Sequence, residues 1–161
     1  AGASDDMVEA IVEGIGQFAA GEFAPINRIG DTVGAKWDDG KVTMPEGFKQ
    51  AYAQFVEGGW ASIDGAEDFG GQGLPYSLSA LILETCGAAN FAFTLCPMLS
   101  FGAIEAIHVH GSDEQKAQYL PNLISGAWPC VLPQSRLPRA NMPENTGSRV
   151  RKSTSPSANM I

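Results

Sequence analysis

The sequence predicts an all-α domain over residues 1–128, an orthogonal bundle of five or six helices. Three observations support this prediction. Apolar residues recur at intervals of three and four residues, helix-capping patterns mark several helix starts, and no two segments alternate between apolar and polar residues as a strand pair would. Residues 129–161 lack these signals, and we expect them to form a disordered carboxy-terminal tail.

The first helix is expected to begin directly after Ser4. The Ser4 side chain suits an N-cap, two acidic residues follow in the first turn, and apolar residues then recur at helical spacing. The apolar period continues past Pro25 as far as Asp31. This pattern predicts a helix that is kinked at the proline and continues beyond it.

A turn and a second helix follow. The segment 37–41 is predicted as a loop, because it contains the turn dipeptide Asp39-Gly40. A helix is expected to start near Pro45 and to stop at Gly58-Gly59. The glycine-rich stretch up to Pro75 is then predicted to be a tight loop. It lacks the flanking strand and the Lys-Ser/Thr pair of a phosphate-binding loop, so we interpret it as a structural turn.

The last part of the domain is predicted to contain four helices. Three of them are expected at 77–88, 90–99 and 101–110. A capping box formed by Ser112 and Gln115 marks the start of the fourth, which should end near Ser125. His108 and His110 lie two residues apart on a helix and point in different directions, which favours a surface or core role over catalysis.

Composition indicates a globular protein and excludes several classes. Hydrophobic residues make up 44% of the 161 residues, and no apolar run reaches the roughly 20 residues of a membrane span. The first residues do not resemble a secretory signal, so we expect a cytoplasmic protein. The three cysteines and two histidines lack the spacing of metal ligands, and no metal site is expected.

Charge divides the chain at Trp128. Residues 1–128 hold 17 acidic and five basic side chains, whereas residues 129–161 hold one acidic and five basic side chains. Nucleic-acid binding requires clustered Lys and Arg, so the acidic part is not expected to bind nucleic acid.

Three segments, in this order and spacing, carry a resemblance to a known family. They read WDDGKVT at 37–43 with GFK at 47–49, DFGGQGLP at 68–75, and HGSDEQKAQYLP at 110–121. Together they resemble the amino-terminal helical domain of acyl-CoA dehydrogenases over about residues 7–128. The first segment is similar to the long bacterial branch that includes methylmercaptopropionyl-CoA dehydrogenases.

The resemblance implies part of a three-domain flavoenzyme. In this family a glutamate removes the α-proton of an acyl-CoA, and the β-carbon passes hydride to FAD. That glutamate lies in the last domain, and the middle and last domains hold most of the flavin. Residues 1–128 are therefore expected to contain no catalytic, cofactor-binding or metal-binding residue and to be inactive alone. The full-length enzyme would use FAD, an acyl-CoA substrate and an electron-accepting partner, as a homo-oligomer.

The resemblance also implies one binding role within residues 1–128. Counting back from Gly111 places Leu95, Met98, Leu99 and Gly102 on the wall of the acyl-chain pocket. Ordinary core packing is the alternative interpretation of each of these residues.

Residues 129–161 are interpreted as a frameshifted tail. In the family, the segment after Trp128 would begin the flavin-binding middle domain. Codons can be chosen for residues 149–161 that give a second peptide when they are read in a shifted frame, starting at the third base of each codon. That peptide is GTKIYFSVGEHD, which is close to the sequence of the middle domain. A frameshift after Trp128 would explain this match, and DNA with an open frame and no shift would contradict it.

Two function hypotheses follow from these observations. The favoured one is a fragment of an FAD-dependent acyl-CoA dehydrogenase, and an acyl-CoA oxidase shares the same dehydrogenation half-reaction. The rival is a non-catalytic helical protein-interaction module. A full-frame product that is yellow with flavin and oxidises acyl-CoA would favour the first, whereas a stable, colourless monomer would favour the second.

Overall fold

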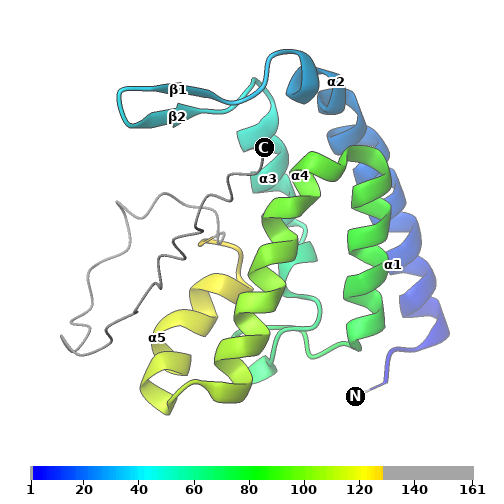
Figure 1. The fold of residues 1–161 in the computed structure, drawn as a ribbon. Coiled ribbons are helices and arrows are strands. Elements are labelled where there is room, and N and C mark those ends of the chain that lie inside the picture. Colours follow the sequence, from blue (N-terminus) through cyan, green and yellow to red (C-terminus); the bar gives the residue numbers. More distant parts are fainter. Residues whose placement is uncertain (1, 129–161) are drawn as a thin grey trace, which may run out of the picture.

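The computed structural model describes residues 2–128, so the disorder and the frameshift predicted for residues 129–161 lie outside the described residues. The described chain is mostly helical, as predicted (Figure 1). Its α-helices are α1 (Asp5–Phe18), α2 (Ala24–Thr32), α3 (Phe48–Glu57), α4 (Tyr76–His110) and α5 (Asp113–Ile124). Two 3-10 turns, Trp60–Ser62 and Glu67–Phe69, precede α4.

The amino-terminal helices confirm the predicted cap and the predicted helical continuation past Pro25. Ser4 Oγ accepts a hydrogen bond from the Met7 amide at 3.3 Å, as an N-cap should. A π-helical turn, Ala19–Phe23, then joins α1 to α2, and Pro25 lies in the first turn of α2. Pro25 has no amide hydrogen to donate, and directly before it the Ala24 amide already donates to the Ala19 carbonyl, five residues back, in place of the α-helical bond. The chain therefore stays helical from Asp5 to Thr32, and the π-helical turn lies directly before the proline.

A β-hairpin corrects the prediction that residues 1–128 contain no strand pair. Strands β1 (Lys36–Asp38) and β2 (Lys41–Thr43) pair antiparallel, with Trp37 opposite Val42. The two turn residues, Asp39 and Gly40, have φ angles of 40° and 79°. Positive φ at both positions is the requirement of a type I′ hairpin turn. The turn dipeptide was predicted, but three-residue strands exposed on both faces show no alternating pattern.

Three separate helices were predicted between residues 77 and 110, with breaks near residues 90 and 100. The structure confirms the first break and contradicts the second. These residues form the single element α4, which is interrupted only at Asn90, where φ is −157° and ψ is 89°. We call residues 76–89 the first arm and residues 91–110 the second arm. The arms fold back beside each other, and the first arm lies along α1 (Figure 1). No break occurs at Ser100, because one serine lowers helix propensity only slightly.

Asn90 makes the bend with its side chain. Its Oδ1 accepts a hydrogen bond from the Phe93 amide at 3.0 Å, which makes Asn90 the N-cap of the second arm. Its Nδ2 donates to the Phe23 carbonyl at 3.3 Å, and Thr94 Oγ1 donates to the Asn90 carbonyl at 3.0 Å. Asn90 is fully buried, so these bonds satisfy polar groups that water does not reach.

The core lies between α1, the π-helical turn, α3 and α4, and aromatic rings dominate it. Phe23 is the central ring, with centroid distances of 4.2 Å to Phe93, 5.1 Å to Phe18 and 6.0 Å to Phe55. Aromatic pairs at such distances add roughly 0.5–1.5 kcal/mol beyond the area they bury. The other members of the core cluster are Ile15, Ile26, Phe48, Ala51, Ile63, Leu78, Ile82 and Cys86.

The glycine-rich segment before α4 is a tight loop, as predicted. Gly65 and Gly71 pack backbone to backbone, and a Cβ on Gly71 would collide with the Gly65 carbonyl group. Gln72 Nε2 donates to the Gly59 carbonyl at 2.8 Å and to Ser62 Oγ at 3.0 Å. These contacts fold the loop on itself and fix where α4 begins.

Helix α5 begins with the predicted capping box. The Gln115 amide donates to Ser112 Oγ at 3.3 Å, and the Ser112 amide donates to Gln115 Oε1 at 2.9 Å. The helix ends at Ile124, and its end is tied to α3 by the Tyr52 hydroxyl, which donates to the Gly126 carbonyl at 2.9 Å. Helix α5 also packs beside the second arm.

Candidate functional site

The structure brings the four predicted pocket residues together on one face of the second arm. Leu95, Met98, Leu99 and Gly102 are spaced by three and four residues, so their side-chain directions fall within about 100° of arc around the helix. All four are exposed, and a Cβ on Gly102 would meet no atom within 4 Å. Core packing among the described residues therefore does not account for them.

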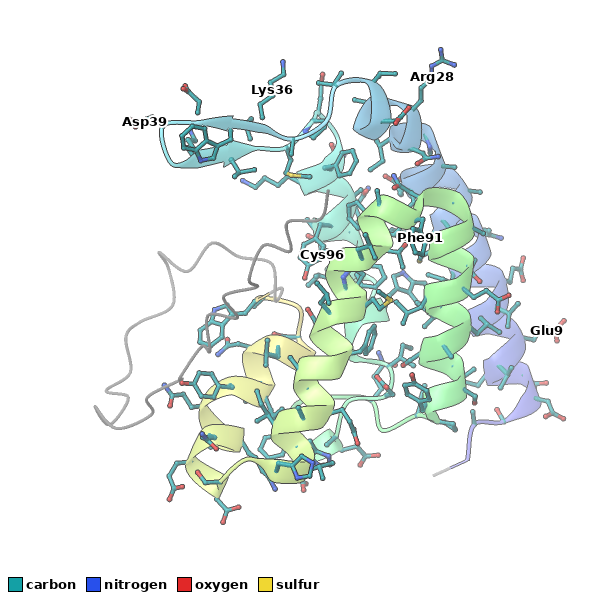
Figure 2. All side chains as sticks on the ribbon, in the orientation of Figure 1. Glu9, Arg28, Lys36, Asp39, Phe91 and Cys96 are labelled. Carbon is teal, nitrogen blue, oxygen red and sulfur yellow. The ribbon has the colours of Figure 1, made fainter. Side chains whose placement is uncertain are left out.

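Two further apolar residues extend this face, and the sequence analysis missed both. Phe91 lies beside the bend of α4 (Figure 2). Val109 lies one residue before the end of the same helix. Together with Leu95, Met98 and Leu99, they make five apolar side chains whose exposed fractions run from 40% to 65%. The helical spacing of Phe91 and Val109 relative to Leu95 and Gly102 could have revealed them. We call Phe91, Leu95, Met98, Leu99, Gly102 and Val109 the outer strip.

An exposed apolar strip of this length is unusual for the surface of a soluble protein. The second arm buries other residues, such as Phe93, Thr94 and Pro97, in the bundle, while the outer strip faces away from it. Soluble proteins seldom leave large contiguous apolar patches in water, and such patches usually mark binding sites or interfaces. The outer strip is therefore the best candidate for a functional surface.

A groove adjoins the outer strip and shares Met98 and Gly102 with it. The groove has a volume of about 690 Å³ and lies between both arms of α4, the glycine-rich loop and α5. Leu74, Leu83, Phe101, Ile104 and Ile124 supply apolar lining, and Asp64, Tyr76, Glu105 and His108 supply its ionisable groups. No lysine or arginine of the described residues lines it, so its chemistry suits an apolar segment better than a phosphate.

The described residues do not by themselves fit a complete FAD site. The diphosphate of FAD needs basic side chains or free amides at a helix start or glycine-rich loop. The glycine-rich loop is filled by its own backbone, and Glu67 packs against Gly73 within it. The five basic residues of residues 1–128 are spread over α2, the hairpin, α3 and α5.

The remaining chemistry of the described residues is structural. Burial raises the pKa of the Cys86 thiol to about 12, so the thiol stays protonated and unreactive at neutral pH. Hydrogen bonds from Ser112 and from its own backbone lower the pKa of Glu114. His108 and His110 are exposed, and the His108 ring packs edge-on against Phe69 with a centroid distance of 6.4 Å. No group of three metal-ligating side chains gathers within residues 2–128.

Helix α4 is long and apolar enough to cross a membrane by length and composition alone. The bend at Asn90 divides it into two arms that fold back on each other, and both arms contribute residues to the core. Its core residues account for part of its apolar composition, and the exposed outer strip accounts for another part.

Comparison with known proteins decides the family. Residues 5–127 match the family of the acyl-CoA dehydrogenase N-terminal domain. The chain belongs to the acyl-CoA dehydrogenase family. The motifs at 37–49, 68–75 and 110–121 all lie within the matched region, so the family resemblance predicted from them is confirmed.

Two curated relatives within the acyl-CoA dehydrogenase family support the match. The chain is 46% identical over 123 residues to 3-methylmercaptopropionyl-CoA dehydrogenase of Ruegeria pomeroyi, covering 76% of this chain and 21% of that protein. It is 31% identical over 109 residues to butyryl-CoA dehydrogenase of Syntrophomonas wolfei, covering 66% of this chain and 18% of that protein. The chain thus spans about a fifth of the length of the curated relatives it matches.

A solved structure confirms the fold of this acyl-CoA dehydrogenase domain. It is described as "Electron transferring flavoprotein of Acidaminococcus fermentans: Towards a mechanism of flavin-based electron bifurcation". The superposition has a TM-score of 0.62 at 21% sequence identity and covers 79% of this chain and 30% of that chain. At this identity the likeness supports the fold and nothing finer.

Proposed function

We propose that residues 1–128 serve as the amino-terminal helical domain of an FAD-dependent acyl-CoA dehydrogenase. In that enzyme the outer strip forms one wall of the pocket for the acyl chain. The family match and the two relatives, both named for the dehydrogenation of acyl-CoA thioesters, support the reaction class. The observation that carries the pocket role is the solvent-facing position of Leu95, Met98, Leu99 and Gly102.

The physical basis of the pocket role is apolar burial. Each CH₂ group of an acyl chain gains roughly 0.8 kcal/mol when it leaves water for an apolar surface. Leu95, Met98 and Leu99 offer such a surface along one side of the second arm, and Gly102 leaves an open space within it. A wall of this kind selects the acyl chain by length and width and leaves the chemistry to other parts of the enzyme.

This proposal divides the work between domains. Residues 1–128 supply apolar contacts, and proton abstraction and flavin chemistry are carried out elsewhere in the enzyme. The glutamate base and most of the FAD site would belong to the middle and last domains of the family. FAD, the electron-accepting partner, assembly into a homo-oligomer and a cytoplasmic location are thus proposed for the complete enzyme. The domain alone is expected to be inactive.

Gly102 provides the sharpest test of the wall. The host is the Ruegeria pomeroyi relative in which this chain's residues 5–127 replace the matching region. In this chimera, Gly102→Leu should lower kcat/KM for long acyl-CoA substrates about tenfold or more relative to short ones, because the new side chain occupies space that the acyl chain needs. The ratio of kcat/KM values across a series of acyl lengths measures the effect.

Gly16→Leu is the matched control. Gly16 lies on α1, and a Cβ there would also meet no atom within 4 Å. The same exchange in the same kind of helix should leave the chain-length preference unchanged. An unaltered preference in the Gly102→Leu chimera, with both variants folded and carrying flavin, would contradict the pocket role.

A further inference from the structure

The β-hairpin is the most exposed structured part of the molecule. It extends away from the helices, with β1 as its upper edge in Figure 1, and all six strand residues are exposed. Trp37 has an exposed fraction of 73%, the highest among the large apolar side chains of the described residues. Its cross-strand partner Val42 projects from the same face and is also exposed.

Within residues 2–128, the outer edge of β1 has backbone groups without a hydrogen-bond partner. In a two-residue hairpin, the pair that flanks the turn directs its amides and carbonyls across the hairpin, and the next pair directs them outward. Asp38 and Lys41 flank the turn here, so the backbone of Trp37 faces the free edge. Outside the hairpin's own ladder, no hydrogen bond among residues 2–128 reaches Lys36, Trp37 or Asp38. The free edge can therefore accept another strand.

The charges of β1 are complementary to those of a second, antiparallel copy of β1. If two copies of β1 pair antiparallel with Trp37 opposite Trp37, each Lys36 lies opposite the Asp38 of the other copy. The outward-facing amide and carbonyl of Trp37 then bond with those of the second Trp37. The edge of β2 lacks this property, because Lys41 would face Thr43.

We propose that the β1 edge pairs with the β1 edge of a second copy of this chain. The product is a four-stranded antiparallel sheet with a two-fold axis at Trp37, and the contact is isologous. Two central tryptophans and two flanking valines then share one face of the sheet. This pairing also supports a hairpin that would be marginal alone, since isolated two-stranded hairpins are barely stable in water.

The contact is small, so the association should be weak and depend on concentration. Stable interfaces bury about 1,200–2,000 Å² in total, and two three-residue strands provide less. Sedimentation equilibrium on the whole 161-residue chain, over a range up to millimolar concentration, measures it. Lys36→Asp should weaken self-association about tenfold or more, because the new carboxylate then faces Asp38 of the other copy at two symmetric positions.

A mixing experiment separates strand pairing from damage to the fold. The double variant Asp38→Lys with Lys41→Asp keeps opposite charges across the hairpin but places its new lysine opposite Lys36 of a second copy. It should also self-associate weakly. Mixed with the Lys36→Asp chain, it should form a heterodimer at least as tight as the unaltered homodimer, because both cross-strand pairs become opposite in charge.

Lys49→Asp is the charge-matched control. Lys49 is exposed on α3, away from the strand edge, and its exchange changes the net charge as Lys36→Asp does. It should leave self-association unchanged. The proposal is overturned if the unaltered chain stays monomeric, if Lys36→Asp and Lys49→Asp associate equally, or if the mixture fails to form the heterodimer. It does not rest on the acyl-pocket role, and neither result decides the other.

Discussion

At the scale of single residues, Cys86 shows how burial controls chemistry. Its side chain is fully buried, and burial raises its thiol pKa from 9.0 to about 12. The folded state therefore keeps a proton that the unfolded state releases at alkaline pH. By linkage, the stability that Cys86 contributes is complete below pH 9 and is lost as the pH rises from there toward 12.

Urea unfolding at a series of alkaline pH values tests this behaviour. Cys86→Ala should lower stability at neutral pH by about 1 kcal/mol for the lost apolar volume, and it should also make the decline above pH 9 shallower. Cys96→Ala, at a half-buried position on the second arm, serves as the control. An identical alkaline decline in the Cys86→Ala and unaltered chains would refute the linkage.

The four residues proposed for the acyl pocket show how much the sequence reveals about a single position. Leu95, Met98, Leu99 and Gly102 could be placed on one helix face by spacing and by family resemblance, and the structure does place them together. Their exposure could not be predicted, because the same spacing is typical of a core-facing stripe. Phe91 lies four residues before Leu95 on the same arm, so the same spacing could have placed it on this face.

At the scale of elements, Asn90 determines how α4 bends. Its amide group caps the second arm at Phe93 and binds the Phe23 carbonyl. Asn90→Ala removes both bonds and leaves a buried carbonyl without this partner, so we expect a loss of roughly 2–3 kcal/mol in the free energy of unfolding.

Equilibrium urea unfolding followed by far-UV circular dichroism measures that loss. Asn27→Ala, at an exposed position on α2, is the matched control and should change stability by less than about 0.5 kcal/mol. If the two alanine variants unfold at the same urea concentration, Asn90 does not hold the bend in the way described.

The sequence predicted well those elements whose starts are marked by residues only a few positions apart. The caps at Ser4 and Ser112 depend on residues within three positions, and both were located correctly. The hairpin was missed because its strands are too short to show alternation, although its turn was recognised. The break predicted at Ser100 was wrong because a single serine is too weak a signal to end a helix.

At the scale of the whole molecule, the fold leaves one apolar surface, the outer strip, exposed for contact with other parts of an enzyme. The aromatic core lies on one side of the second arm, and the outer strip lies on the other side with no cover among the described residues. The chain spans about a fifth of the length of its curated relatives, so the surfaces that would cover the strip are proposed to lie in the other domains. The fold class and the family could be predicted because three motifs report on them. The groups that carry out the reaction are proposed to lie outside the described residues.

The most direct test of the proposed function is the chimera in which residues 5–127 of this chain replace the matching region of the Ruegeria pomeroyi relative. The account predicts a folded, yellow protein that retains bound flavin and reduces an electron acceptor in the presence of an acyl-CoA. A folded chimera that is colourless, or that holds flavin but does not oxidise any acyl-CoA, would contradict the account.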